Sequence, residues 1–443
     1  MTSLKERIRK SRLFFLYNPR DPYSLGRLIM LSSTATANLA SVLTTGLFYT
    51  GFLIDNGINL TSIGILTFVP PITSCFTLLS PLILERFKKR KWLLFFFRMM
   101  YYSMYILGGT LVPLFVHDPA MKVVCFVVVV FLGHSFNALS SSGFSAWHIN
   151  FMPDNVRAEH IGINSLVANI SAQGFGLIFA LIADAFAGTP GESGLFITLR
   201  FIAYAVGIFD CILLLIPREF PYGSSGEKPR IRDIFVKSLR NKKFAGCIML
   251  LCMWTFAYNL PASVLNYRIL EELKLSYSYI QVINVIYPIF VFAFLVPCQR
   301  FIKKLGWLET MSIGICMDIV SFFAYGLVVP GNVSWLFPTV RIVQHLSTSL
   351  FSGIPVNNLV YFNLPDEDRT HYLSFYILAN NAASFLGLMC GTWFVTIAPD
   401  FSFHIGSIHV GNIQFLLMLQ SLMLLVMLIT VQFTKKKLRP STM

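Results

Sequence analysis

Long apolar runs recur throughout the 443-residue sequence and are separated by short polar connections. Each run holds about 20 residues, the length that an α-helix needs to cross the hydrocarbon core of a bilayer. A chain that is 55% apolar and only 13% charged cannot hide this much apolar surface in one water-soluble core. We therefore expect an all-α polytopic membrane protein with twelve transmembrane helices. The runs lie near residues 25–51, 62–84, 92–116, 121–147, 162–186, 194–217, 244–268, 279–298, 307–329, 335–360, 373–397 and 411–434.

Positive charge gathers in alternate connections. With the N-terminus placed in the cytoplasm, 29 of the 35 Lys and Arg residues fall on the inner side. The outer side keeps four, which are Lys122, Arg200, Arg268 and Lys274. This asymmetry predicts that both termini are cytoplasmic, which requires an even number of spans. The net charge of +14 therefore indicates contact with anionic lipid head groups rather than with nucleic acid.

One short motif occurs twice. Pro153-Asp154-x-x-Arg157 returns 212 residues later as Pro365-Asp366-x-x-Arg369, each time between two apolar runs. Such a repeat predicts two pseudo-symmetric halves of six helices, an organisation typical of transporters. We expect a cytoplasmic N-terminal segment at 1–24, a six-helix bundle at 25–217, a cytoplasmic linker at 218–243, a second bundle at 244–434 and a cytoplasmic tail at 435–443.

The loop after the second run carries a family resemblance. It reads Pro81-Leu-Ile-Leu-Glu85-Arg86-Phe-Lys-Lys-Arg-Lys91 and is similar to the Gly-x-x-x-Asp-Arg-x-Gly-Arg-Arg loop of the major facilitator superfamily. A degenerate copy runs from Gln299 to Gly306. Glu85 replaces the family's aspartate, and Pro81 and Lys88 stand at its glycine positions. The resemblance covers essentially the whole chain and implies the major facilitator fold and transport by alternating access.

The same resemblance implies a cytoplasmic gate. In the family, a carboxylate at this loop holds the N-terminus of the eleventh span, where helix N–H groups attract an anion. Glu85, followed by Arg86, would then hold the chain near Leu373, with Arg369 as an ionic partner. Asp154 and Asp366 could cap short helices, with Arg157 and Arg369 binding carboxylates or lipid phosphates. The alternative is that these charges only fix the topology.

The substrate cavity of the family is lined by the first, fourth, seventh and tenth spans. In the fourth span, His134, Asn137 and Ser141 are spaced i, i+3, i+7 and share one helix face. The tenth span repeats the pattern in His345, Thr348 and Ser352, with Arg341 one turn earlier. The cavity residues we expect are Asn38, His134, Asn137, Trp254, Tyr258, Asn259, Arg341, His345 and Thr348.

Each of these residues also has a structural interpretation. Serine and threonine in membrane helices usually bond to their own backbone, which we favour for Ser41, Thr45, Ser141 and Ser352. The histidines could be interhelical hydrogen-bond donors, solute ligands or proton carriers. Arg341 could face a cavity or extend toward the outer surface. For Arg98 we expect such an extension, toward the cytoplasmic surface.

Few carboxylates lie inside the spans. We expect Asp210 and Asp318 to pair with neighbouring helices, because the sixth and ninth spans are peripheral in the family. A coupling proton could instead pass through Asp318 or through His134 and His345. Facilitated diffusion without a coupling ion remains an alternative.

These patterns favour a secondary active transporter for a small organic solute. Arg341 favours a solute with a carboxylate or phosphate. A neutral sugar or nucleoside-like solute is the alternative, as is a receptor or scaffold that keeps the fold without transporting. No nucleophile-base pair or metal-ligand spacing indicates an enzyme, a cofactor or a metal site. We expect a monomer in the bacterial cytoplasmic membrane.

Overall fold

The structure is a computed structural model that describes residues 15–84, 87, 89–219, 231–363, 369–406 and 408–438.

Side chains cap the long helices at their first turns. Asp21 and Asp118 each precede a proline and accept a hydrogen bond from the backbone N–H three residues further on, at 2.8 and 2.7 Å. Proline has no N–H to leave unpaired, so each Asp-Pro pair is suited to begin a helix. Asn241 accepts in the same way from the N–H of Phe244, at 3.1 Å.

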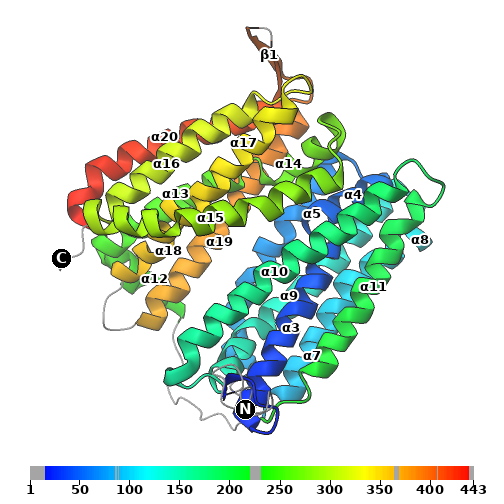
Figure 1. Cartoon of the computed structure of the whole chain (residues 1–443), viewed down its shortest axis with the longest axis vertical. Helices are drawn as coiled ribbons and strands as arrows, with labels where there is room; N and C mark the ends of the chain where they lie inside the picture. The colour runs from blue at the N-terminus through cyan, green and yellow to red at the C-terminus, as the bar shows by residue number, and fades with distance from the viewer. Residues whose placement is uncertain are drawn as a thin grey trace, which may run out of the picture. The chain divides into compact units, whose positions relative to one another are not determined.

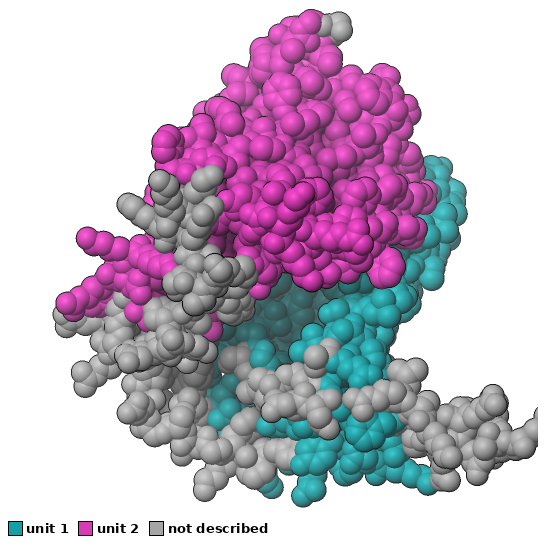
Figure 2. All heavy atoms as spheres, turned by 60° about the vertical axis from the view of Figure 1, so that its left-hand side comes forward, with its two compact units in different colours: residues 1–58, 73–226 teal, residues 59–72, 227–443 magenta. Residues whose placement is uncertain are grey.

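The chain divides into two compact units (Figure 2). Unit 1 comprises residues 1–58 and 73–226, and unit 2 comprises residues 59–72 and 227–443. The elements up to the middle of the chain are α3 (Pro22–Thr44), α4 (Gly46–Asp55), α5 (Leu60–Thr73), η1 (Ser74–Leu79), α6 (Ser80–Leu84), α7 (Lys91–Tyr101), η2 (Tyr102–Gly108), α8 (Gly109–Phe115), α9 (Pro119–Ile149), α10 (Asp154–Phe186) and α11 (Glu192–Leu213). Of these, α5 lies almost wholly in unit 2.

The rest of unit 2 follows in chain order. Its elements are α12 (Ile231–Arg240), α13 (Lys242–Asn259), α14 (Ala262–Tyr267), η3 (Arg268–Glu272), α15 (Tyr277–Leu305), α16 (Trp307–Gly326), α17 (Val333–Leu346), η4 (Ser347–Phe351), α18 (Gly353–Phe362), α19 (Arg369–Ile397), β1 (Ser402–Ile405), β2 (Ile408–Gly411) and α20 (Asn412–Leu438).

In unit 1, α3 packs against α10 and α11, and α7 packs against α9 (Figure 1). A buried cluster that includes Met30, Leu84, Leu94, Trp147 and Phe151 joins α3, α6, α7 and the end of α9. The large apolar side chains thus fix the ends of four helices around one core.

In unit 2, α16 packs against α20, and α13 packs against α19 and α20. The short helix α5 belongs to this unit through its side chains. Phe68 meets Phe385 of α19 edge-on with ring centroids 5.7 Å apart, and the hydroxyl oxygens of Thr61 and Thr396 lie 3.0 Å apart. The first part of the expected second span, α5, therefore packs against α19 of unit 2. The repeat in the sequence predicts instead that this span belongs to the first half of the chain.

Nine helical stretches of the described residues are long and apolar enough to cross a membrane. The other three runs read from the sequence, 92–116, 335–360 and 373–397, are helical almost throughout. Two of them contain π-helical turns, η2 and η4. The protein is a multi-pass membrane protein, and twelve spans remain the expectation from the sequence.

Two details depart from uninterrupted helices. The first span breaks between α3 and α4, where Gly46 has φ +57°, a left-handed conformation that glycine adopts without strain. The connection from α19 to α20 contains the antiparallel hairpin of β1 and β2, with Ser402 opposite Gly411 and Ile405 opposite Ile408. Nothing in the apolar pattern of the sequence indicated this hairpin.

The close approach of α16 to η4 gives a test of the packing. A β-carbon on Gly314 would lie 2.3 Å from the backbone nitrogen of Ser352 and 2.5 Å from the carbonyl carbon of Phe351, so the backbone would have to move. We expect Gly314→Ala to destabilise the fold by about 1–3 kcal/mol. Thermal unfolding of the purified protein measures the effect.

Gly246→Ala is the matched control. Gly246 is exposed on α13 and has open space around its β-carbon position, so alanine should stabilise its helix slightly. Equal melting temperatures for the two variants would contradict the close packing of α16 and η4.

Candidate functional site

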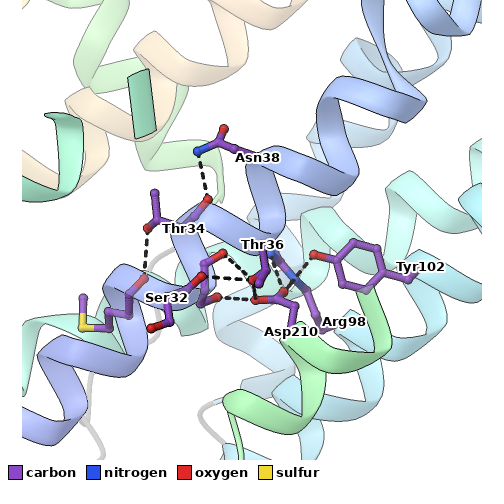
Figure 3. A network of polar contacts seen from close by, with 9 residues as sticks. Ser32, Thr34, Thr36, Asn38, Arg98, Tyr102 and Asp210 are labelled. Atoms are coloured by element: carbon purple, nitrogen blue, oxygen red, sulfur yellow. Dashed lines mark hydrogen bonds and ion pairs between the residues drawn. The ribbon is translucent and has the colours of Figure 1, made fainter. Parts of the chain in front are cut away.

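A buried ion pair lies in unit 1 between α7 and α11. Asp210 is fully buried, and its Oδ2 atom lies 3.1 Å from Nη2 and 3.2 Å from Nε of Arg98 (Figure 3). The expected pairing of Asp210 with a neighbouring helix is confirmed. The expected extension of Arg98 to the cytoplasmic surface is wrong, because the carboxylate of Asp210 holds its guanidinium inside the bundle.

Three hydroxyl groups complete the shell around Asp210. Ser33 and Thr36 of α3 donate to Oδ1 at 2.5 and 3.1 Å, and Tyr102 donates to Oδ2 at 2.8 Å (Figure 3). Hydrogen bonds to an ionised group are stronger than those between neutral groups. The carboxylate therefore joins α3, α7, η2 and α11 at one point.

A cavity of about 160 Å³ adjoins this network. Asn137 and Ser141 of the predicted stripe line it, together with Ser33, Arg98 and His148. His148 follows the stripe by one further heptad, a continuation that the sequence interpretation missed. The cavity thus offers a cation, an amide, hydroxyls and an imidazole within unit 1.

His134, the first residue of the same stripe, does not line this cavity. Its ring packs edge-on against Tyr101 and Tyr105, with centroids 5.6 and 4.8 Å away. The structure therefore places His134 among the aromatic residues of α7 and η2, outside the lining of the cavity that Asn137 and Ser141 share.

The side chains of several predicted polar residues donate hydrogen bonds to backbone carbonyls of their own helices. Asn38 donates to the carbonyl of Thr34 at 2.9 Å, and Asn259 donates to that of Thr255 at 2.8 Å. The predicted backbone bonding is confirmed for Thr45, Ser141 and Ser352, at 2.8, 3.0 and 3.1 Å.

In unit 2 a second carboxyl group is buried, with different surroundings. Asp318 of α16 is fully buried, and the hydroxyls of Tyr258, Ser347 and Ser352 lie beside it. Among the described residues, no hydrogen bond of good geometry reaches either carboxyl oxygen, and no salt bridge does. Among the described residues, Asp318 thus lacks the cation that Asp210 has. The expected pairing of Asp318 with neighbouring helices is limited to these hydroxyl groups.

The tenth span places Ser347 and Ser352 beside this carboxyl group. The π-helical segment η4 begins at Ser347, whose hydroxyl donates to the carbonyl of Gly314 at 2.8 Å. Thr348 donates to the carbonyl of Gln344 at 2.9 Å. π-Helical turns are frequent at functional sites, because they redirect side chains and free carbonyl groups.

Arg341 and His345 precede η4 on α17. The Nη1 atom of Arg341 donates to Oε1 of Gln344 at 2.9 Å. The ring of His345 stacks on Tyr287 of α15, with centroids 4.0 Å apart and planes 13° apart, and its Nε2 atom is buried without a partner among the described residues. Neither Gln344 nor Tyr287 was selected from the sequence, because their roles depend on neighbours within the fold.

Tyr258 of α13, whose hydroxyl lies beside Asp318, packs against Trp254 of the same helix. The rings of Trp254 and Tyr258 are 4.4 Å apart, and Tyr258 also meets Phe322 edge-on at 5.3 Å. Trp254 Nε1 and the hydroxyl of Tyr258 are buried and make no hydrogen bond of good geometry to the described residues. The predicted pair therefore offers both a flat surface and two donors.

Two arginines that the sequence placed in outer connections are in fact buried. Arg200 donates to Thr110 at 3.0 Å and to the carbonyl of Tyr105 at 3.1 Å, and its guanidinium lies 4.4 Å from the ring centre of Phe52. Arg268 pairs with Glu272 at 3.2 Å and donates to the carbonyl of Val328 at 2.6 Å. Both are 1% exposed, so neither lies in a solvent-exposed connection.

The predicted gate falls largely outside the described residues. Glu85, Arg86 and Asp366 lie outside them, as do the side chains of Asp154, Arg157 and Arg369. The backbone shows that α10 begins at Asp154 and that α19 begins at Arg369. The expected short helix at Asp154 is wrong, because α10 runs for 33 residues from Asp154 to Phe186. Of the second copy, Arg369 is the first residue of the long helix α19.

Comparison with solved structures identifies the fold. The chain resembles the nucleoside transporter NupG, with a TM-score of 0.68 and 13% identity over 93% of this chain and 99% of that one. It also resembles a bacterial homologue of the iron transporter ferroportin in the inward-facing state, with a TM-score of 0.69 and 10% identity over 92% and 98%. For the xylose transporter XylE from E. coli, inward open, the TM-score is 0.65 and the identity 14% over 95% and 97%.

These neighbours are transporters with the major facilitator fold, and this chain has the same fold. No protein-family model matches the sequence, and no curated protein matches it. At 10–14% identity the likeness establishes the fold and leaves the solute open.

The two buried carboxyl groups should differ in their effect on stability. Asp210→Asn leaves Arg98 without a carboxylate, so we expect a loss of about 3–5 kcal/mol, typical of breaking a buried ion pair. Asp318→Asn removes no ion pair and should change stability by about 1 kcal/mol or less. Thermal unfolding in detergent compares the two variants.

Replacing both partners provides the control for Asp210. In Arg98→Met with Asp210→Leu no buried charge is left alone, and stability should recover toward that of the wild type. Similar losses in the two asparagine variants would refute the contrast between the carboxyl groups.

Proposed function

We propose that the protein is a secondary active transporter that moves a small organic anion across the membrane by alternating access. The fold supports transport, since the solved proteins that share it carry small solutes. The charge of the solute is inferred from Arg341. The cytoplasmic membrane of a bacterium, a monomeric state and cytoplasmic termini are part of the proposal.

The proposal that the solute is an anion rests on Arg341. Among the described residues, Arg98 and Arg268 are each paired with a carboxylate, and Arg27 and Arg200 are buried and donate to backbone carbonyl groups. Arg341 is only partly buried and bonds to the neutral amide of Gln344. A partly buried intramembrane arginine that bonds only to a neutral amide among the described residues favours an anionic ligand, because the ligand supplies the missing charge.

Asp318 supports proton coupling. A buried carboxylate without a cation is costly, and binding a proton removes the charge. The hydroxyls of Tyr258, Ser347 and Ser352 beside it could pass the proton on. His134 and His345 remain alternative carriers, but both rings pack against tyrosines.

A neutral sugar or nucleoside-like solute is the second candidate. It is favoured by Trp254 and Tyr258, whose rings could stack on a flat solute while their free donors bind its hydroxyls. A receptor or scaffold without transport is the alternative from another class. Under either transport proposal, Glu85, Arg86, Asp154, Arg157, Asp366 and Arg369 form the cytoplasmic gate.

Arg341 is tested with a thermal-shift screen followed by uptake into liposomes. Small carboxylates and phosphate esters should stabilise the wild type, and those that do should be taken up. Arg341→Gln should weaken their binding by about 10- to 100-fold, because a charged hydrogen bond contributes about 1.5–3 kcal/mol.

Arg240→Gln is the control, since Arg240 lies exposed on α12. Stabilisation and uptake of neutral nucleosides or sugars, unchanged in Arg341→Gln, would favour the second candidate. Binding without uptake would favour the receptor.

Asp318 is tested by separating coupling from exchange. Asp318→Asn cannot release a proton, so uptake driven by a pH gradient should fall at least tenfold, on the order of the effects seen for proton-transfer groups. Counterflow of solute, which needs no net proton movement, should persist.

Asp118→Asn is the matched variant, because asparagine caps a helix as well as aspartate does. If Asp318→Asn retains full accumulation under a pH gradient, Asp318 is not the proton carrier.

A further inference from the structure

The hairpin between α19 and α20 carries a pair of histidines. His404 of β1 lies directly opposite His409 of β2 in the antiparallel register. Figure 1 shows this hairpin extending beyond the helices of unit 2. Residues directly opposite each other in such a pair have β-carbons about 4.5–5.5 Å apart, so their side chains meet on one face.

The two faces of the hairpin have opposite characters. Side chains alternate along a strand, so Phe403 and Val410 point to the face opposite the histidines. Val410 is fully buried, and Phe403 packs against Phe415 of α20 with ring centroids 6.3 Å apart. This apolar face anchors the hairpin to unit 2 and leaves both imidazoles exposed on the other face.

The spacing of the imidazoles fits a shared metal ion. Their ring centroids are 5.1 Å apart, and their planes are inclined by 74°. A metal about 2.1 Å from one nitrogen of each ring, with a tetrahedral angle between the two bonds, would place the centroids about 5.2 Å apart. The observed separation therefore requires little movement of either ring.

We propose that His404 and His409 together bind a divalent transition-metal ion of the kind that prefers imidazole ligands, such as Ni²⁺, Cu²⁺ or Zn²⁺. Among the described residues no third His, Cys, Asp or Glu joins them, so water completes the coordination. A cavity of about 450 Å³, lined by His409 and by the Arg268–Glu272 pair, gives that water room. The sequence interpretation found no metal site because the two histidines become neighbours only through the hairpin.

Ni²⁺ titration of the purified full-length protein, followed by calorimetry, tests the proposal. The wild type should bind one Ni²⁺ at this site, and His404→Ala or His409→Ala should each weaken binding by at least about tenfold. Ni²⁺ is the probe because it prefers imidazole, whereas Zn²⁺ also binds the exposed thiols of Cys75 and Cys316. His117→Ala, at an exposed histidine of unit 1, should leave the affinity unchanged.

A second pair of substitutions tests whether lost Ni²⁺ binding reflects loss of the imidazole ligands or damage to the hairpin. Ser402 and Gly411 lie opposite each other on the histidine face, and a β-carbon at Gly411 meets nothing closer than 3.6 Å. Ser402→His with Gly411→His, introduced into the variant lacking both native histidines, should restore Ni²⁺ binding. The proposal is overturned if the double-alanine variant binds Ni²⁺ within twofold of the wild type. It is equally overturned if the wild type shows no binding beyond that variant.

Discussion

The cost of holding charge away from water organises the interior of unit 1. Arg98 and Asp210 are 112 residues apart in the chain, yet they form one ion pair, to which α3 and η2 add three hydroxyl donors. A buried ion pair is stabilising only where further hydrogen bonds satisfy both groups. Positions on four elements are thereby fixed relative to one another, and the adjoining cavity inherits its polar lining from the same residues.

Buried arginines perform a second structural task at carbonyl groups. The π-helical turn η2 leaves the carbonyls of Tyr105 and Ile106 accessible, and Arg200 donates to both. Arg268 donates to the carbonyls of Tyr325 and Val328 at the end of α16. Cations stabilise helix ends where unpaired carbonyl groups gather. Arg200 and Arg268 therefore support the third and ninth spans, which correspond to each other in the repeat.

The sequence predicted the helices well but predicted poorly which side chains of different helices meet, and the reason is physical. Apolar runs of bilayer length leave the backbone little choice but a helix, because no water is present to satisfy unpaired N–H and C=O groups. Helical spacing shows which residues share a face, but it does not show what that face touches. His134 and His345 have identical spacing in the sequence, yet one meets Tyr101 and Tyr105 edge-on and the other stacks flat on Tyr287.

The residues to which we assign solute and proton binding differ between the two halves. Arg341 has Val130 at the same offset of 211 residues, and Val130 is an apolar side chain that is only 1% exposed. Asp210 meets the cation of Arg98, whereas the polar groups beside Asp318, among the described residues, are hydroxyls. A duplicated bundle with equal halves would hold equal charges in equal surroundings. Under the proposed function, the charges of Arg341 and Asp318, both in unit 2, are the ones that a solute and a proton would neutralise.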